Sequence, residues 1–330
     1  MSIQGFPFPF RADTFRYGTN VERARTPVRT EAGEWGARIL DVDENYRSDL
    51  AERARILQAD PGRSCVLPHA VPACWDALLT MLRELASTYS DEMRLDTVGR
   101  GYRWRNARLD ADCTFAVGDD LPGGPLGFLA SQIQDDVVVL DQREGALWAD
   151  AGVVTFAAGW SLGFDVGMAF SEIHGPVPRI RADGVVSRAE RFLMRLRPNE
   201  EYRRTNWSAT LDGHLDQSTE AYETWGPARA ASAGFTGDEL AGRLYLRVEV
   251  QHLIRLGYSG AILFLIRTYL CSLEELATVP EWRTRFGRVL RELPEDMASY
   301  KGLSPFRATA ADWLLSPGRP GAAESPAPAG

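Results

Sequence analysis

Four histidines are the residues best suited to bind a metal or a cofactor, and they are spread along the chain: His69, His174, His214 and His252. None of them falls into an HExxH, HxH or CxxCH spacing, so a zincin site and covalently attached c-type haem both lack sequence support. A site assembled from distant histidines and carboxylates stays open. We interpret His69, just before a helix, and His214, in a loop, as capping or surface residues.

His174 differs from the other three in its neighbours, because it lies in the segment IHGPVP. Pro176 and Pro178 fix their own φ angles and remove backbone donors, which stiffens the segment. Gly175 lets the backbone approach another group closely. A rigid imidazole beside a glycine suits an axial ligand that meets a flat macrocycle edge-on. The alternative is a histidine that caps a turn and hydrogen-bonds in the core.

The composition of the chain argues against several classes of protein. The chain has 330 residues, 45% of them hydrophobic, and a formal net charge of −8, which argues against a nucleic-acid partner. Its N-terminus, MSIQGFPFPFRADTF, lacks the apolar run of a signal peptide, and no stretch approaches the length of a membrane span. We therefore expect a cytoplasmic protein with no membrane partner. The four cysteines form no CxxC pair, and there is no GxGxxG or GxxxxGK[ST] motif.

The elements that must position His174 can be predicted from periodicity. Apolar residues at helical spacing predict helices around 46–57, 75–85, 189–196 and 282–293. In LYLRVEVQ, residues 244–251, apolar and polar residues alternate strictly, which predicts a strand with one apolar and one polar face. The run AILFLIRTYL follows a turn and completes a hairpin. VVVLDQ, ALWAD and VVTFAAGW also read as short strands.

These elements predict an α+β fold with an antiparallel sheet. Residues 1–37 read as an irregular N-terminal arm, 38–316 as a single domain, and 317–330 as a disordered Pro/Ala/Gly/Ser-rich tail.

Several segments resemble the family that includes the haem-dependent oxidative N-demethylases. In chain order they are LDVDENYRSDLAERARILQ, LASQIQDDVVVLD, IHGPVP, RTNWS, LRVEVQHLIRL with SGAILFLIRTYL, and YKG. The resemblance spans about residues 39–303, and the ordered set is more specific than any single motif.

The resemblance implies a PAS-like, haem-binding core with haem b held non-covalently by an axial histidine, a role that falls on His174 in this sequence. It further implies a monooxygenase-type reaction with O₂ that removes a methyl group from a small amine as formaldehyde. Electrons would come from an external flavin/iron–sulfur reductase. The sequence leaves a homo- or hetero-oligomer open.

The resemblance also suggests the residues that surround the haem. The predicted cationic partners of the propionates are Arg179, Arg203 and Arg204. Asn206 and Trp207, which follow them in the chain, are also predicted to contact the cofactor. For the arginines, the alternative is a solvated position on the surface. His252 is second to His174 as a haem contact. Polar residues that could face substrate or oxygen are Asp135, Asp136, Glu172, Arg247, Glu249 and Gln251. Of these, Glu249 and Asp136 are the predicted catalytic residues.

The sequence departs from the family pattern in three places. His252 stands where a small hydroxyl residue is usual, Asp135-Asp136 replaces a Glu-Asp pair, and Arg255-Leu256-Gly257 replaces an Arg-Leu-Pro-type turn. These changes put the substrate in doubt, so N-oxygenation of another amine is a variant of the same hypothesis. Two other classes stay open: a non-catalytic haem-binding gas or redox sensor, and a cofactor-free assembly subunit.

Overall fold

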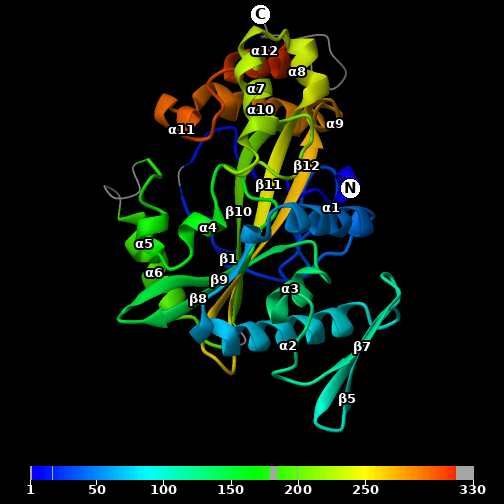
Figure 1. The fold of residues 1–330 in the computed structure, drawn as a ribbon. Helices are drawn as coiled ribbons and strands as arrows, with labels where there is room; N and C mark the ends of the chain where they lie inside the picture. The colour runs from blue at the N-terminus through cyan, green and yellow to red at the C-terminus, as the bar shows by residue number, and fades with distance from the viewer. Residues whose placement is uncertain (1, 17, 179–183, 199, 317–330) are drawn as a thin grey trace, which may run out of the picture.

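A seven-stranded sheet forms the centre of the molecule in the computed structural model, which describes residues 2–16, 18–178, 184–198 and 200–316 (Figure 1). The spatial order is β1-β10-β11-β12-β8-β9-β4, and every neighbouring pair is antiparallel. The strands are β1 (Glu22–Arg23), β4 (Ser64–Val66), β8 (Asp136–Arg143), β9 (Ala146–Val153), β10 (Glu201–Leu211), β11 (Leu244–Arg255) and β12 (Ile262–Ser272). The predicted α+β class is confirmed.

The hairpin of β11 and β12 confirms the alternation that the sequence predicted. β11 pairs with β10 from Leu244 to Ile254 and with β12 from Tyr245 to Arg255, so almost all of it lies between two strands. Its even-numbered residues, such as Val248 and Val250, share one face of the sheet, which we call the core face. Its odd-numbered residues, such as Arg247 and Glu249, share the other, which we call the polar face. Both sets are buried, so the polar side chains face protein.

One predicted strand is wrong in part, because β9 ends at Val153 and the rest of VVTFAAGW leaves the sheet. The buried Asp136 carboxylate accepts the backbone N–H groups of Thr155 (3.0 Å) and Phe156 (2.8 Å). These donors would otherwise continue the strand ladder. A side chain of β8 therefore turns the chain away from the sheet.

Two groups of helices cover the core face, at opposite ends of the molecule (Figure 1). At one end, the predicted helices α1 (Tyr46–Ala59) and α2 (Val71–Thr88) are confirmed, and α2 packs on β8 and on α3 (Gly124–Ala130). At the other end, α10 (Pro280–Glu292) confirms the last predicted helix. The helices packed around it are α8 (Gly237–Arg243), α9 (Leu273–Ala277), α11 (Glu295–Tyr300) and α12 (Arg307–Leu315).

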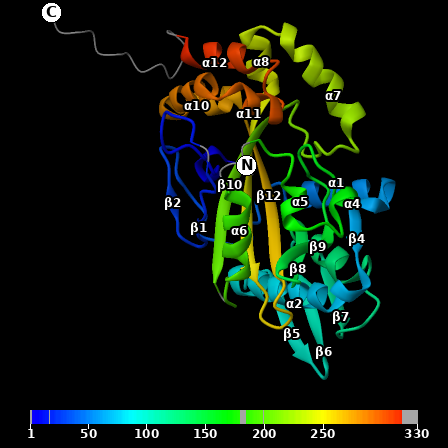
Figure 2. The ribbon, with the colours of Figure 1, turned by 90° about the vertical axis from the view of Figure 1, so that its left-hand side faces the viewer.

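The polar face carries the segment with His174. After β9 the chain forms α4 (Leu162–Asp165), α5 (Phe170–Ile173) and α6 (Val185–Met194), whose apolar residues pack on Val138, Leu140 and Leu253. The helix predicted around 189–196 is thus confirmed, but it begins earlier, at Val185. In Figure 2, α6 is seen upright, with its axis in about the same direction as the long strands β10 and β12.

The remaining elements lie at the periphery. They are β2 (Val28–Arg29), β3 (Glu34–Trp35), β5 (Met93–Val98), β6 (Gly101–Asn106), β7 (Ala111–Phe115), α7 (Tyr222–Ala231) and the 3₁₀ turns Ile3–Gly5, Pro61–Arg63, Pro68–Ala70 and Ser232–Gly234. The predicted tail, 317–330, lies outside the described residues. No helix in the described part of the chain is both long and apolar enough to cross a membrane.

Candidate functional site

His174 follows α5 and has a defined hydrogen-bonding state. Its Nδ1 lies 2.8 Å from the backbone oxygen of Phe170, and its ring centroid lies 4.1 Å from that of Phe170. A carbonyl oxygen can only accept, so Nδ1 carries the proton and Nε2 holds a lone pair. Burial lowers the pKa of His174, and the Arg204 guanidinium lowers it further, so the ring is neutral at pH 7.

This state is the one that a metal-binding histidine needs. Such histidines donate their other ring N–H to a carbonyl or carboxylate, which fixes the tautomer and the ring orientation. Nε2 of His174 makes no hydrogen bond to the residues that the structure describes. The local sequence explains the arrangement, because α5 is a single turn that brings the carbonyl of Phe170 beneath the ring four residues later.

Glu249 lies at the centre of a buried polar cluster on the polar face, in the middle of β11. Its carboxylate accepts hydrogen bonds from Asn206 Nδ2 (3.2 Å) and Gln251 Nε2 (2.9 Å), and Arg247 Nε lies 3.6 Å away. The side chain is only 5% exposed. Gln251 Oε1 is buried and has no hydrogen-bond partner among the described residues. The cluster therefore presents a carboxylate with an unmatched amide oxygen on the neighbouring side chain.

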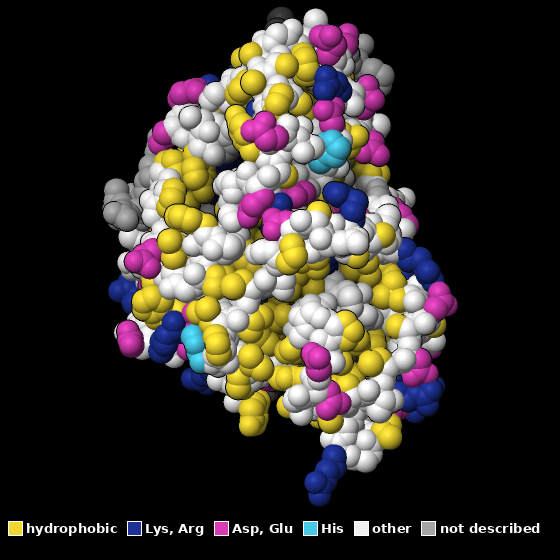
Figure 3. Space-filling view, in the orientation of Figure 1, with side chains coloured by type: hydrophobic (Ala, Val, Ile, Leu, Met, Phe, Trp, Pro, Cys, Tyr) yellow, Lys and Arg dark blue, Asp and Glu magenta, His cyan; other side chains and the backbone are white. Residues whose placement is uncertain are grey.

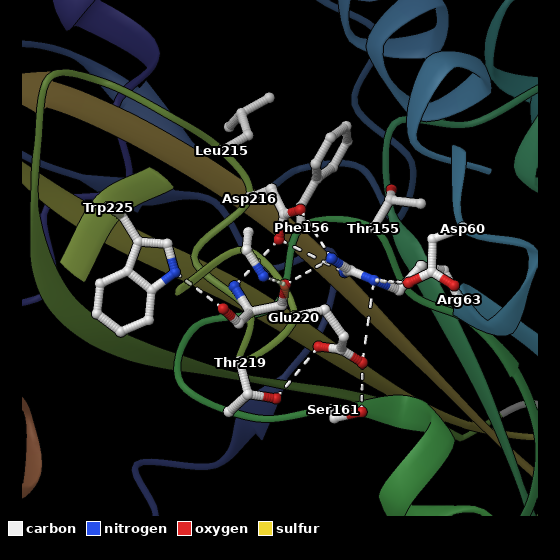
Figure 4. Close-up of polar contacts among 12 residues, drawn as sticks. Asp60, Arg63, Thr155, Phe156, Ser161, Leu215, Asp216, Thr219, Glu220 and Trp225 are labelled. Carbon is white, nitrogen blue, oxygen red and sulfur yellow. Dashed lines mark hydrogen bonds and ion pairs between the residues drawn. The ribbon is translucent and has the colours of Figure 1, made fainter. Parts of the chain in front are cut away.

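Arg247 holds this cluster in place and ties two loops to the sheet. It donates to the backbone oxygens of Phe156 and Leu215 (2.6 Å to Leu215) and to Thr268 Oγ1 (3.1 Å). The second loop is fixed further by Asp216, which pairs with Arg63 at 2.9 Å. Figure 4 shows Arg63 between Asp60, Asp216 and Glu220, next to the loop that contains Phe156. Buried cations thus determine the backbone path around Glu249.

Lys301 is a candidate site residue that the sequence reasoning missed. Its Nζ donates to the backbone oxygen of Trp207 (2.6 Å) and lies 4.8 Å from the centroid of the Trp207 ring. Burial lowers the pKa of Lys301 to about 8, Glu249 opposes this shift, and Arg204 adds to it, so the ammonium lies near both. Two signals could have found it: Lys301 is the only lysine of the chain, and it lies in the segment YKG.

The structure brings together some of the predicted site residues. Arg204 and Asn206 lie opposite Gln251 and Glu249 on β10, so they share the polar face. Arg204 lowers the pKa of both His174 and Lys301, so it lies near both groups. Glu172, two residues before His174, instead caps its own helix by accepting the N–H of Ala169 (2.9 Å). Arg179 lies outside the described residues.

Three predicted cofactor contacts lie on the core face, away from this group. His252 and Arg203 are opposite each other on β11 and β10, and Arg203 donates to Glu22 (3.0 Å) and to the backbone oxygens of Gly36 and Thr26. The Trp207 ring packs among Phe10 and Phe286. Because adjacent residues of a strand point to opposite faces, these three side chains do not converge with His174.

Asp136, the second predicted catalytic residue, has structural partners. Besides the N–H groups of Thr155 and Phe156, its carboxylate accepts from Arg53 Nη2 at 3.0 Å, and both side chains of this pair are buried. Asp135 is buried, and burial raises its pKa to about 7. The geometry therefore favours Glu249 over Asp136 as the carboxylate that meets a substrate.

Within the described part of the chain, one other group has the residue types of a metal site. Ligand atoms of His69, Asp141 and Asp150 lie within 4.8 Å of one another. However, Arg143 Nη1 lies 3.0 Å from Asp141 Oδ2 and also contacts Asp150, so a guanidinium occupies the place of a cation. We interpret this group as a salt-bridge cluster.

On the face shown in Figure 3, acidic and basic side chains are interspersed.

Residues 32–311 match the model of the family described as haem-dependent oxidative N-demethylase, alpha subunit-like. This match covers most of the chain and includes both the His174 segment and the Glu249 cluster. The chain therefore belongs to the haem-dependent oxidative N-demethylase alpha subunit-like family.

Proposed function

We propose that this protein binds haem b through Nε2 of His174 and uses it for the oxidative demethylation of a small amine. The observation that carries the proposal is the state of His174: a neutral ring, a proton fixed on Nδ1 by Phe170, and an Nε2 lone pair with no partner among the described residues. The residues fit the group, since neutral histidine is a common axial ligand of haem iron.

The arrangement of the sheet supports a PAS-like core. Taken in chain order, the strands β8, β9, β10, β11 and β12 lie in the spatial order second, first, fifth, fourth, third, with α4–α6 inserted between the second and the third. This is the strand order of a PAS-like sheet. His174 lies in the inserted segment and Glu249 on the face that this segment covers.

The chain's own residues would bind and orient the amine. A protonated secondary amine has two N–H donors, and Glu249 and the unmatched Gln251 Oε1 offer two neighbouring acceptors. The buried carboxylate of Glu249 would attract the ammonium group of the amine. Asn206 and Arg247 would hold that carboxylate in position. Arg204 is the described cation best placed to pair with a haem propionate, and Lys301 contributes positive charge beside it.

The bound haem would supply oxygen activation. Per turnover, one N-methyl carbon is oxidised to formaldehyde and one O₂ is consumed with two electrons and two protons, yielding the demethylated amine and one water. The electrons require an external donor, for which we propose a flavin/iron–sulfur reductase.

The test is formaldehyde release by hemin-loaded protein supplied with electrons from a ferredoxin reductase system. A panel of N-methylated amines should include at least one that gives one formaldehyde per O₂ consumed. Reversible oxygen binding with no formaldehyde from any amine would instead favour a gas sensor. A protein that takes up no hemin would favour an assembly subunit.

A further inference from the structure

A cavity lies on the core face of the sheet, opposite the side that carries His174. It has a volume of about 320 Å³. Its floor is formed by Val250, His252 and Tyr269 of β11 and β12, and its walls by residues 34–39 and Asp41. At the rim, Ala37 and Arg38 are exposed. The cavity belongs to neither the His174 segment nor the Glu249 cluster.

His252 gives this cavity an unmatched donor and an unmatched acceptor. The side chain is 3% exposed, and neither Nδ1 nor Nε2 has a hydrogen-bond partner among the described residues. Burial lowers the pKa of His252 to about 3, and Arg203 and Arg25 add to the shift. The ring is therefore neutral and offers one N–H and one lone pair. A buried polar group without a partner is destabilising, so a ligand or ordered water is expected there.

Trp35 supplies a second unmatched donor to the same cavity. Its Nε1–H is buried and has no partner among the described residues. The indole is held in place, because the Arg203 guanidinium lies 4.6 Å from the ring centroid while donating to Glu22 and to backbone oxygens. Trp35 and His252, the two residues with unmatched N–H donors, thus line the same cavity.

Charged groups of both signs surround the cavity: the charges that lower the pKa of His252 are the cations Arg203 and Arg25, and Glu34 and Asp41 contribute carboxylates to the wall. Arg203 pairs with Glu22, and Arg25 pairs with Glu84 and Glu201, so both cations are partly neutralised. The carboxylate of Asp41 is partly neutralised by Arg38 (3.7 Å), and Tyr269 Oη lies 3.4 Å from it. The volume is roughly twice the ~150 Å³ that accommodates benzene, so an aromatic or branched aliphatic acid has room.

We propose that this cavity binds a small organic carboxylate whose oxygens accept the N–H groups of Trp35 and His252. The proposal does not rest on the haem site, because the two sites lie on opposite faces of the sheet. Ordered water is the competing occupant. A cavity that holds only water would bind an acid no more tightly than a neutral analogue of the same size.

The test uses acetate, benzoate and phenylacetate as probes on the full chain, with benzyl alcohol as the neutral control. Binding is followed by calorimetry and by the indole N–H resonance of Trp35. We expect at least one acid to bind saturably, to move that resonance, and to bind at least about ten-fold more tightly than benzyl alcohol.

Two variants assign the site. Trp35→Phe removes the N–H but keeps most of the ring, and His252→Leu removes both nitrogens. Each should weaken binding of the acid about ten-fold or more, whereas the exposed control His69→Leu should leave it unchanged. Circular dichroism confirms that each variant is folded. Absence of saturation by all three acids, equal binding of benzyl alcohol, or unchanged binding in both variants would overturn the proposal.

Discussion

At the scale of single residues, the site depends on how the protein fixes protons and charges. His174 receives its tautomer from a backbone carbonyl one turn earlier, and Glu249 receives its orientation from two amides and a guanidinium. The sequence predicted both residues. It could not predict the tautomer, because that depends on the path of α5, nor the contact of Lys301 with Trp207, because that contact joins residues far apart in the chain.

Replacing Glu249 by Gln should weaken amine binding while leaving haem binding intact. The variant keeps the shape of the side chain but removes the charge that attracts an ammonium. We expect kcat/KM for the best amine to fall by about 10–100-fold, mostly through KM. The measurement is formaldehyde release at several amine concentrations. The control Glu239→Gln, on an exposed helix start, should behave as the wild type. An unchanged KM for Glu249→Gln would contradict the assignment.

Replacing Asp135 by Asn should stabilise the protein at high pH only. The pKa of Asp135 is about 7 in the folded protein, against an ordinary value of 3.8, so folding favours the protonated form. Its contribution is fully present below about pH 4 and is lost as the pH rises through 7. Asn cannot ionise, so the variant should be more stable than the wild type at pH 8, on the order of 2–4 kcal/mol. Urea unfolding at pH 4 and pH 8 tests this. Equal differences at both values would refute it.

At the scale of elements, local patterns predicted the regular parts and missed the parts that side chains redirect. Strict alternation identified β11, and helical spacing identified α1, α2 and α10. The end of β9 was missed because it depends on Asp136, a residue of another strand. The helix α8 was missed although its capping box, Thr236 with Glu239, is visible in the sequence.

Arg247 should be more important for stability than any exposed arginine, because it ties two loops to the sheet. Replacing it by Met leaves buried carbonyl oxygens and Glu249 without their cation. We expect a loss of about 3–5 kcal/mol in the free energy of unfolding. The control Arg243→Met removes an exposed pair with Asp212 and should cost about 1 kcal/mol or less. Denaturant unfolding compares the two, and similar losses would contradict the proposed clamp.

At the scale of the whole molecule, three hydrophobic clusters surround one sheet, and the N-terminal arm contributes three phenylalanines to one of them. Phe6, Phe8 and Phe10 are buried against the C-terminal helices. Composition predicted an irregular arm, but it could not predict this packing, because the partners lie near the other end of the chain. The arm also forms a wall of the His252 cavity.

Truncating Phe8 should therefore destabilise the whole fold. Its ring stacks on Trp282 with centroids 4.5 Å apart, and it is 4% exposed. We expect Phe8→Ala to cost about 3–5 kcal/mol. The matched control Phe164→Ala, at a residue that is 71% exposed, should change stability by less than about 0.5 kcal/mol. Thermal unfolding measures both; a Phe8→Ala variant as stable as the wild type would show that the arm is not part of the core.

The visible absorption spectrum after reconstitution with hemin tests the central claim most directly. The wild-type chain should take up one equivalent of hemin and show the Soret band of a histidine-ligated haem. His174→Ala should lose or clearly shift that band, while His69→Ala and His252→Ala should keep it. A wild-type chain that binds no hemin, or a His174→Ala variant with an unchanged spectrum, would contradict the account.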